Sequence, residues 1–599
     1  MYWLARLLII YVGLLQGGFL CGKTVKETHM NTQTRLITPA RSAARAPNNF
    51  SLSQKLLRFG GQKSYLTLGG ACENILMVGG MGSAKTTSSF FTSGKSLFEA
   101  GCGGLGLGVK YNARNETFQM AREAGRGHDV IMFYPGSGQR FNWIDYESKV
   151  HGPGNEIIDN LMDVFVSSTE VISRKIGQGQ SEPFWEYSWR QMLKQFLFLD
   201  IHANGGVDFI RVLEMCQTLP RSFADLEQPQ DFASLKALEA AKKNCPPTQE
   251  RSMRLAINYM TKEMPALSDR TRACIQQMCS AMLDHHVRDL YQDAFGGQST
   301  WTPDDILEDG RILICGYDID RFGAMGQCIN SIIKKCVQRA IARRREKFGS
   351  NMDRCRPVVF VMDEAPFLVD SQDERFLRVG RENRAISLWA IQSIPSMVME
   401  LGGGDAARTQ VDALLGHFHT KVMHQNECNV TNDKMADIVA KDLAWRQGIN
   451  INQGPNGPNQ GENWNLQLDY LLPPIAFKQL KRGGVNNNWD VRAIVTMPDH
   501  RWSDGKRWQA IKFIQNCEPK KEHFALEFFF DYSPASIWRD KVPVARIWVK
   551  HVPFLQLLRD VWRRPEKAYW LIRRWLAFWI GIPASTNVYN ECEKEINDV

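Results

Sequence analysis

Several features that define other protein classes are missing from this chain of 599 residues. Its 14 Cys form no Cys-x-x-Cys pair and no metal-ligand spacing, which favours reduced thiols in a cytosolic compartment over a disulfide frame or a zinc site. The sequence has no internal repeat. Hydrophobic residues make up 44%, charged residues 23%, and the mean hydropathy is -0.32, which exclude a disordered chain and a polytopic membrane transporter. A large globular protein with a sizeable core remains.

Positive charge is in excess, but little of it lies in the middle of the chain. The formal net charge is +9, from 73 Lys and Arg against 64 Asp and Glu. Residues 1–50 hold six basic and one acidic residue, and 545–583 hold eight basic and two acidic residues. Residues 584–599 hold one basic and four acidic residues, which leaves a net +1 for 51–544. The excess therefore belongs to the two ends, and it suits an anionic membrane more than a DNA footprint on the central region.

An apolar run opens the chain. It extends over about 15 residues, from Leu7 to Cys21, and is shorter than the roughly 20 residues that cross a bilayer. Basic residues follow it, which favours retention of the main body in the cytoplasm. We predict an N-terminal membrane segment within residues 1–50. The alternative is a mis-assigned start, since Met30 lies just after the run.

Short apolar runs separated by helical patterns predict a mostly parallel α/β sheet covered on both faces. The expected strands lie at 74–78, 104–109, 128–134, 311–317, 357–362, 386–392, 419–425 and 490–496. This rhythm stops between 206 and 300, where three- and four-residue apolar spacing predicts an inserted all-α domain. Residues 450–465, rich in Asn, Gly, Gln and Pro, are expected to form a loop.

A glycine-rich segment follows the first of these strands and precedes an expected helix at 87–100, the context of a phosphate-binding loop. Small residues there let backbone N–H groups wrap a phosphate at a helix N-terminus. Lys85 would reach the β- and γ-phosphates of ATP, and the Thr86 hydroxyl would bind Mg²⁺. Ala84 departs from the pattern GxxxxGK[ST], so a positive φ at this residue would be strained. The predicted cofactor-binding residues are Gly79, Gly80, Met81, Gly82, Ser83, Ala84, Lys85, Thr86 and Thr87.

Two carboxylates follow the apolar strand at 358–362. Asp363 and Glu364 would lie at the C-terminal edge of a parallel sheet, where ligands of such sheets bind. Asp363 would hold Mg²⁺ through water together with Thr86. Glu364 would act as the base that polarises the attacking water.

A third strand, at 386–391, ends in Gln392, whose amide can sense the γ-phosphate. Arg378, Arg381 and Arg384 precede this strand at three-residue spacing on an expected helix. One of them, with Arg381 and Arg384 as the candidates, would act as an arginine finger across a subunit boundary. A solvated basic helix face is the alternative for each Arg.

The ordered motifs resemble the type IV secretion coupling proteins, which are hexameric, membrane-anchored motor ATPases. The resemblance covers roughly 65–515 and rests on the phosphate loop, on VVFVMDEAPFL from Val358 and on GRENRAISLWAIQS from Gly380. It implies a RecA-like P-loop ATPase that uses ATP and Mg²⁺ at the bacterial inner membrane, with its ATPase body in the cytoplasm. Of the family's Asp-Pro-Lys-Gly-Glu motif only Lys110 is kept. The family usually begins with two membrane helices, whereas this chain has at most one.

The expected domains are a membrane segment and linker (1–50), an ATPase domain in two parts (51–205 and 301–515), the all-α insert (206–300) and a C-terminal region (516–599). Residues 545–583 hold five of the 17 Trp, interleaved with Arg and Lys. This pattern is typical of a basic amphipathic segment at a membrane surface, of a docking segment within a secretion complex, or of a nucleic-acid platform.

The leading hypothesis for function is a motor that recruits single-stranded DNA with its relaxase and drives it into a type IV secretion channel during conjugation. Two alternatives stay open: a coupling ATPase for protein effectors, and a nucleotide-binding assembly scaffold with little turnover. A chromosome-segregation pump fits the Gln392 strand and the helical insert poorly.

Overall fold

The computed structural model describes residues 50–59, 64–150, 155–173, 183–349, 351–454, 457–497, 500–502 and 505–516. The predicted N-terminal membrane segment and the C-terminal Trp-rich segment lie outside these residues. No helix of the described residues is long and apolar enough to cross a membrane.

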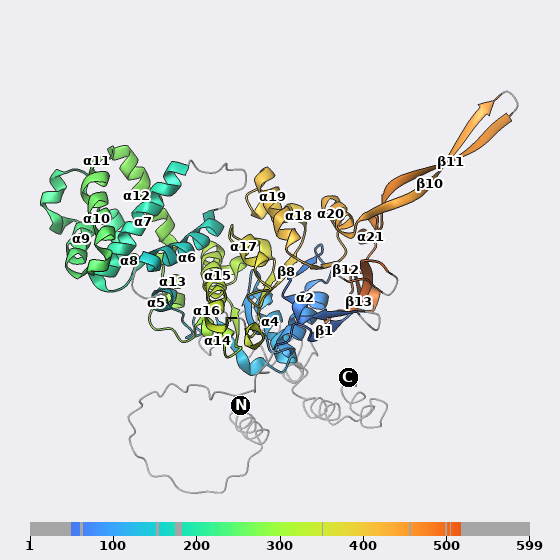
Figure 1. The fold of residues 1–599 in the computed structure, drawn as a ribbon, viewed down its shortest axis with the longest axis horizontal. Helices are drawn as coiled ribbons and strands as arrows, with labels where there is room; N and C mark the ends of the chain where they lie inside the picture. Colours follow the sequence, from blue (N-terminus) through green and yellow to red (C-terminus); the bar gives the residue numbers. More distant parts are fainter. Residues whose placement is uncertain are drawn as a thin grey trace, which may run out of the picture. The chain divides into compact units, whose positions relative to one another are not determined.

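A sheet of nine strands forms the centre of the fold, in the order β13-β12-β9-β3-β8-β7-β4-β6-β5 (Figure 1). Neighbouring strands from β9 to β5 are parallel, and β12 and β13 form an antiparallel edge. The strands are β3 (Ile75–Val78), β4 (Gly103–Leu107), β5 (Val130–Phe133), β6 (Ile312–Cys315), β7 (Val358–Asp363), β8 (Ala385–Ile391), β9 (Thr420–Met423), β12 (Asp490–Thr496) and β13 (Trp508–Ile514). The mostly parallel α/β sheet expected from the sequence is thus confirmed.

The sheet is buried on both faces because its central strands are almost entirely apolar, with Ser387 in β8 and Asp363 at the end of β7 as polar exceptions. On β3, Leu76 and Val78 join one core and Ile75 and Met77 join the other. Helices α3 (Phe91–Glu99) and α4 (Tyr111–Glu123) contribute to the second core, and α15 (Ile319–Ala342) contributes to the first. The remaining helices around the sheet are α2 (Leu68–Ala71), α14 (Pro303–Leu307), α16 (Arg344–Phe348), α17 (Asp373–Arg378), α18 (Ile394–Glu400), α19 (Gly404–Gly416), α20 (Asn429–Val439) and α21 (Ile475–Lys478). A short strand pair, β1 (Lys55–Arg58) and β2 (Tyr65–Thr67), lies outside the main sheet.

Glycines in β4 let helices approach the sheet closely. A Cβ on Gly103 would lie 2.2 Å from the Ile306 carbonyl oxygen, and one on Gly106 would lie 2.8 Å from the Thr117 side chain. Contacts this short are repulsive, so larger residues would push α14 and α4 outward. The close packing of α4 brings its side chains near the carboxyl end of β7.

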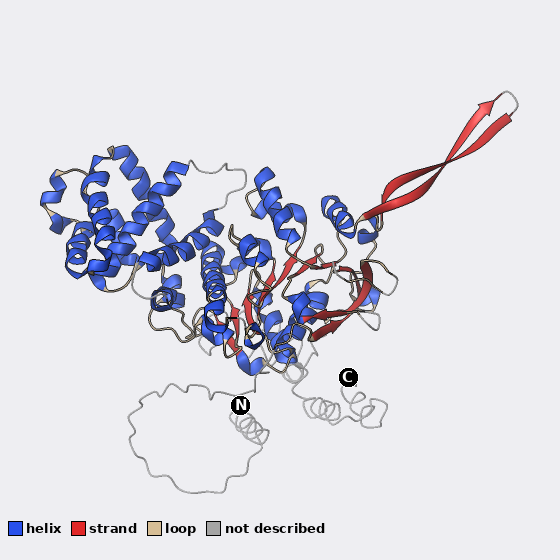
Figure 2. Cartoon of the chain, in the orientation of Figure 1, coloured by secondary structure: helices blue, strands red, loops and turns tan. Residues whose placement is uncertain are grey.

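Helices fill the stretch between β5 and β6, where the described residues contain no strand (Figure 2). Besides α14, they are α5 (Trp143–Val150), α6 (Asn155–Ser173), α7 (Pro183–Asn204), α8 (Phe209–Gln217), α9 (Ala233–Asn244), α10 (Glu250–Asn258), α11 (Met264–Ala266), α12 (Asp269–Leu283) and α13 (Asp289–Phe295). Helix α7 packs against α8, α9, α10 and α12. The helical stretch therefore begins before residue 206, because α7 buries its apolar side among the helices that follow it.

The expected loop at 450–465 was wrong. The chain forms a two-stranded antiparallel ribbon there, from β10 (Lys441–Gly454) and β11 (Gly457–Tyr470), with register Lys441↔Tyr470 to Gly454↔Gly457. Figure 2 shows this ribbon extending away from the central sheet, and β11 contacts α20. Asn- and Gly-rich composition is typical of turns, but regular pairing over fourteen residues in each strand outweighs it here.

Candidate nucleotide-binding site

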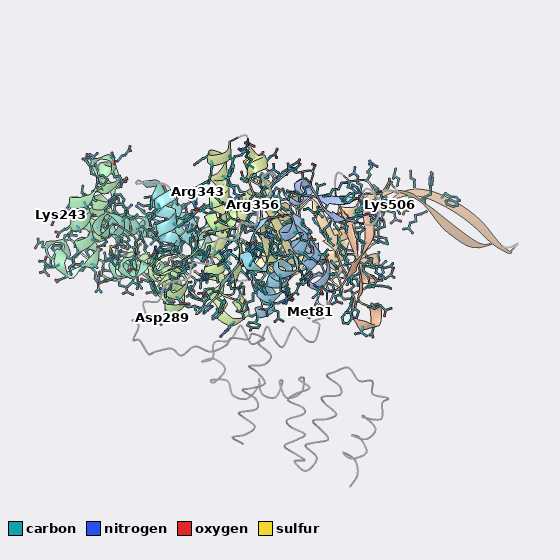
Figure 3. All side chains as sticks on the ribbon, turned by 90° about the horizontal axis from the view of Figure 1, so that it is seen from below. Met81, Lys243, Asp289, Arg343, Arg356 and Lys506 are labelled. Carbon is teal, nitrogen blue, oxygen red and sulfur yellow. The ribbon has the colours of Figure 1, made fainter. Side chains whose placement is uncertain are left out.

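The glycine-rich segment 79–87 leaves the end of β3 and enters a π-helical turn, η1 (Thr86–Phe90), that leads into α3. Gly79 is required by space, because a Cβ there would lie 2.6 Å from Ser83 Oγ. Gly82 has a φ of +71°. Met81 is 85% exposed at the loop and is labelled in Figure 3. The backbone thus turns sharply at the carboxyl end of a parallel strand, as a phosphate loop requires.

Ala84 adopts a φ of 59°, as its place in the motif predicts. This left-handed conformation is cheap for glycine and costs about 1 kcal/mol for alanine. The carbonyl oxygen of Ala84 accepts a hydrogen bond of 2.6 Å from Ser88 Oγ, which ties the strained residue to the start of the helix. The loop therefore keeps the phosphate-binding shape at an energetic cost.

Thr86 and Asp363 meet, although 276 residues separate them in the chain. Thr86 Oγ1 donates to Asp363 Oδ2 at 3.3 Å, because η1 begins beside the end of β7. Burial raises the pKa of Asp363, and the nearby Lys85 ammonium opposes that shift. A hydroxyl and a carboxylate are the hard oxygen ligands that Mg²⁺ accepts while keeping several waters. The two side chains fit the role of holding Mg²⁺ at this edge.

Glu364 lies at the centre of a group of polar side chains. Its Oε1 accepts hydrogen bonds from Lys110 Nζ at 2.6 Å and from Gln392 Nε2 at 2.7 Å, and Lys85 Nζ lies 4.0 Å away. Burial tends to raise the pKa of Glu364, but Lys85, Gln392 and Lys110 together hold it below its ordinary value. The carboxylate is therefore anionic, the state that a general base needs.

The backbone of Glu364 is left-handed, with a φ of 57° and a ψ of 46°. Glu364 is 4% exposed, and the turn η9 (Ala365–Leu368) follows it directly. A non-glycine residue in this conformation costs of order 1 kcal/mol or more and clusters at functional sites. The backbone strain thus falls on the residue that the sequence assigns as the base.

Glu116 is a further acidic residue at this site, and the sequence did not single it out. It lies on α4, which begins directly after Lys110, and it is partly buried. Burial and the neighbouring Asp363 raise its pKa to about 7, against the opposing effect of Lys110 and Lys85. The sequence feature that could have pointed to Glu116 is its position about two turns into the helix that follows Lys110.

The structure does not bring Arg381 or Arg384 to the phosphate loop of the same chain. They precede β8 whereas Gln392 follows it, and seven residues of strand separate the two ends by about 23 Å. Helix α17 ends at Arg378, so the expected helix does not extend to Arg381 and Arg384, which lie in a turn.

The two arginines differ in their surroundings. Arg384 is 4% exposed and donates to the Phe50 carbonyl oxygen and to Asp353. The Arg381 side chain is 59% exposed and pairs with Glu73. Arg384 is committed to internal contacts, whereas Arg381 is accessible to another molecule.

The fold and the loop geometry together define a RecA-like P-loop architecture. Among solved structures, the chain is similar to the bacterial conjugative coupling protein TrwBdeltaN70 in an unbound monoclinic form, with a TM-score of 0.51 and 12% identity. The plasmid coupling protein TrwB gives a TM-score of 0.50 both with a GTP analogue, at 12% identity, and with an ATP analogue, at 13% identity. Each match covers 78% of this chain and 92% of the other. No family model and no curated protein matches the sequence. The expected resemblance to coupling proteins is confirmed in the fold.

Proposed function

We propose that the protein is an ATP-hydrolysing coupling motor of a type IV secretion system. In this proposal it recruits a DNA–relaxase complex and drives it into the secretion channel during conjugation. It works as a homo-hexamer at the bacterial inner membrane, with its ATPase body in the cytoplasm. The observation that carries the ATPase part is the convergence of Lys110 and Gln392 on one oxygen of Glu364, 4.0 Å from Lys85.

Each residue has a defined task in this proposal. The backbone of the loop and the Lys85 ammonium bind the phosphates, and Thr86 with Asp363 holds Mg²⁺. Bound Mg²⁺ neutralises phosphate charge and orients the γ-phosphate. Glu364 accepts a proton from the attacking water, and Gln392 keeps the carboxylate in place. Arg381 of a neighbouring copy supplies the remaining positive charge.

The full-length protein tests this proposal directly. ATP turnover should be stimulated by single-stranded DNA, and Lys85→Ala should abolish it. Lys95→Ala is the matched control, since Lys95 lies in α3 and pairs with Glu99 and Glu123 away from the loop. Stimulation by a secreted protein instead of DNA would identify the effector-coupling alternative.

A nucleotide-binding scaffold is the second candidate, and the strained Ala84 favours it. Ala84 and residues 108–112 both depart from the expected motifs, and a scaffold needs nucleotide binding but no turnover. If ATP binds without turnover in the presence of DNA, and Lys85→Ala changes only assembly, the protein is a scaffold.

A further inference from the structure

The ribbon of β10 and β11 has one strongly apolar face. Residues two apart on a strand share a face, and the register places Leu443 opposite Leu468 and Trp445 opposite Leu466. Trp464 lies on the same face of β11, next to Leu466. These side chains are 48–69% exposed, so water contacts most of them. We name this set, Leu443, Trp445, Trp464, Leu466 and Leu468, the ribbon face.

The opposite face of the same segment is polar. It carries Asp442 and Asp469, which are cross-strand partners, and Arg446, which pairs with Asp469. Apolar and polar residues are thus sorted by face although most of the described side chains of this segment are exposed. An isolated two-stranded ribbon is only marginally stable in water and gains stability when one face is covered. The sorting indicates that a partner covers the ribbon face.

The chemistry of the ribbon disfavours lipid and nucleic acid as that partner. Within the described residues each strand pairs only with the other, so both outer edges keep unpaired backbone groups that lipid cannot satisfy. Nucleic acid requires cations for its phosphates. In the part of the ribbon whose side chains are described, the one cation on this face is Lys441, which already pairs with Asp437. A protein surface is the occupant that this chemistry fits.

The chain itself carries a matching surface. A cleft of about 290 Å³ lies between the end of α6, the start of α15, the turn η9 and α18. Its apolar lining includes Ile172, Ile319, Pro366, Phe367 and Met399, and Met399 is 46% exposed. The cleft has room for a large side chain such as an indole, and buried Trp anchors dominate many interfaces.

We propose that the ribbon face of one copy docks into the Phe367 cleft of a second copy of this chain. The five side chains expose roughly 500 Å² of surface. If the receiving copy buries a similar area, the total buried surface reaches about 1,000 Å², the lower bound for a specific contact. The donor and receptor surfaces differ, so each copy gives one ribbon and receives another. Such head-to-tail contacts form a ring when the rotation from copy to copy closes, and an open filament when it does not. The cleft includes Pro366 and Phe367, which belong to the turn η9 that begins directly after Glu364, so docking acts on the segment next to the base.

Two double variants of the full-length protein test the proposal. Leu466→Asp/Leu468→Asp places charges on the ribbon face, and Asn465→Asp/Gln467→Asp places the same charges on the polar face of the same strand. All four positions are exposed, so the fold should tolerate both variants. We expect the first to weaken self-association at least tenfold in sedimentation without nucleotide, and the second to leave it unchanged. Equal association of the two variants would overturn the proposal.

The receptor side is tested separately. Met399→Asp should weaken self-association to a similar degree, whereas Val485→Asp, at a position 72% exposed outside the cleft, should not. A photo-crosslinker in place of Trp445, in a mixture of ¹⁴N and ¹⁵N protein, should give mixed-isotope crosslinks to segments 365–368 and 394–402. Crosslinks confined to one chain, including any to 517–599, would refute docking between copies. Since no turnover is measured, such a failure leaves the ATPase proposal standing.

Discussion

Lys110 Nζ lies 2.6 Å from Glu364 Oε1, which joins the end of β4 to the end of β7 across the candidate site. Gln392, after β8, donates to the same oxygen at 2.7 Å. Three adjacent strands thus fix one carboxylate, and all three residues come from motifs that the sequence singles out. The Lys110 side chain is 48% exposed, so it has room to leave the carboxylate when a nucleotide binds.

Lys110→Ala should lower the maximal rate of ATP turnover by about tenfold or more, because a hydrogen bond to a charged group contributes about 1.5–3 kcal/mol. The KM for ATP should change little, since Lys85 and the loop backbone supply the phosphate contacts. Steady-state kinetics of the full-length protein check this. Lys110→Arg should recover part of the rate by restoring the cation. Lys149→Ala, which removes an exposed pair with Asp145, is the control and should match the wild type.

Ala84→Gly should stabilise the protein by about 0.5–1 kcal/mol, because glycine adopts a φ of 59° without the strain of a Cβ. Thermal unfolding without nucleotide measures the change. Ala406→Gly is the matched control, since Ala406 is exposed in the first turn of α19, where the same substitution should lower stability and not raise it. A loss of stability in both variants would mean that Ala84 is not strained in solution.

His286 should make stability depend on pH between about 7 and 5. It is fully buried beside Phe165, and burial, with a smaller effect of His285, lowers its pKa from 6.5 to about 3. The unfolded chain therefore binds a proton below pH 6.5 that the folded chain refuses, so stability falls as pH falls. The loss from pH 7 to pH 5 should be about 2 kcal/mol smaller in His286→Gln, as measured by urea unfolding. The control is His128→Gln, at a half-exposed position. This variant should lose as much stability between pH 7 and pH 5 as the wild type does.

The strands and the phosphate loop could be predicted because their signals are local. Runs such as Ile75–Val78 are apolar at every position, and Asp363 follows such a run directly. A parallel strand that is buried on both faces is a continuous apolar run, so it can be recognised in the sequence without knowing which strand it pairs with. The positive φ of Ala84 likewise follows from its place in the motif. The strands and the phosphate loop were therefore enough to place the candidate site in the sequence. Residues that distant elements bring to the site could not be found in this way.

The remaining features depend on contacts that the sequence does not encode locally. The ribbon of β10 and β11 was missed because its strand state comes from pairing and not from composition. Burial of Arg384 depends on Asp353 and on the backbone of Phe50, far away in the chain. Glu116 becomes notable only where α4 brings it near Asp363.

Replacing Arg381 and Arg384 by alanine should have different effects on the stability of the protein. Arg384→Ala should destabilise the protein by about 2 kcal/mol, because it removes a buried charged donor from Asp353 and the Phe50 carbonyl oxygen. Arg381→Ala should leave stability within about 0.5 kcal/mol, because an exposed ion pair with Glu73 contributes little. Thermal unfolding of both variants checks this difference.

A mixing experiment then tests whether Arg381 acts across a subunit boundary. Arg381→Ala and Lys85→Ala should each abolish most ATP turnover alone. When the two proteins are mixed and allowed to assemble, some sites combine an intact Lys85 from one copy with an intact Arg381 from its neighbour. Turnover should then reappear, at roughly a quarter of the wild-type rate for random mixing of equal amounts if each site acts independently. Recovery should not occur when Lys85→Ala is mixed with the double variant Lys85→Ala/Arg381→Ala, which offers no intact Lys85. If Arg381→Ala alone keeps full turnover, Arg381 is not the finger, and its pairing with Glu73 is a surface contact only.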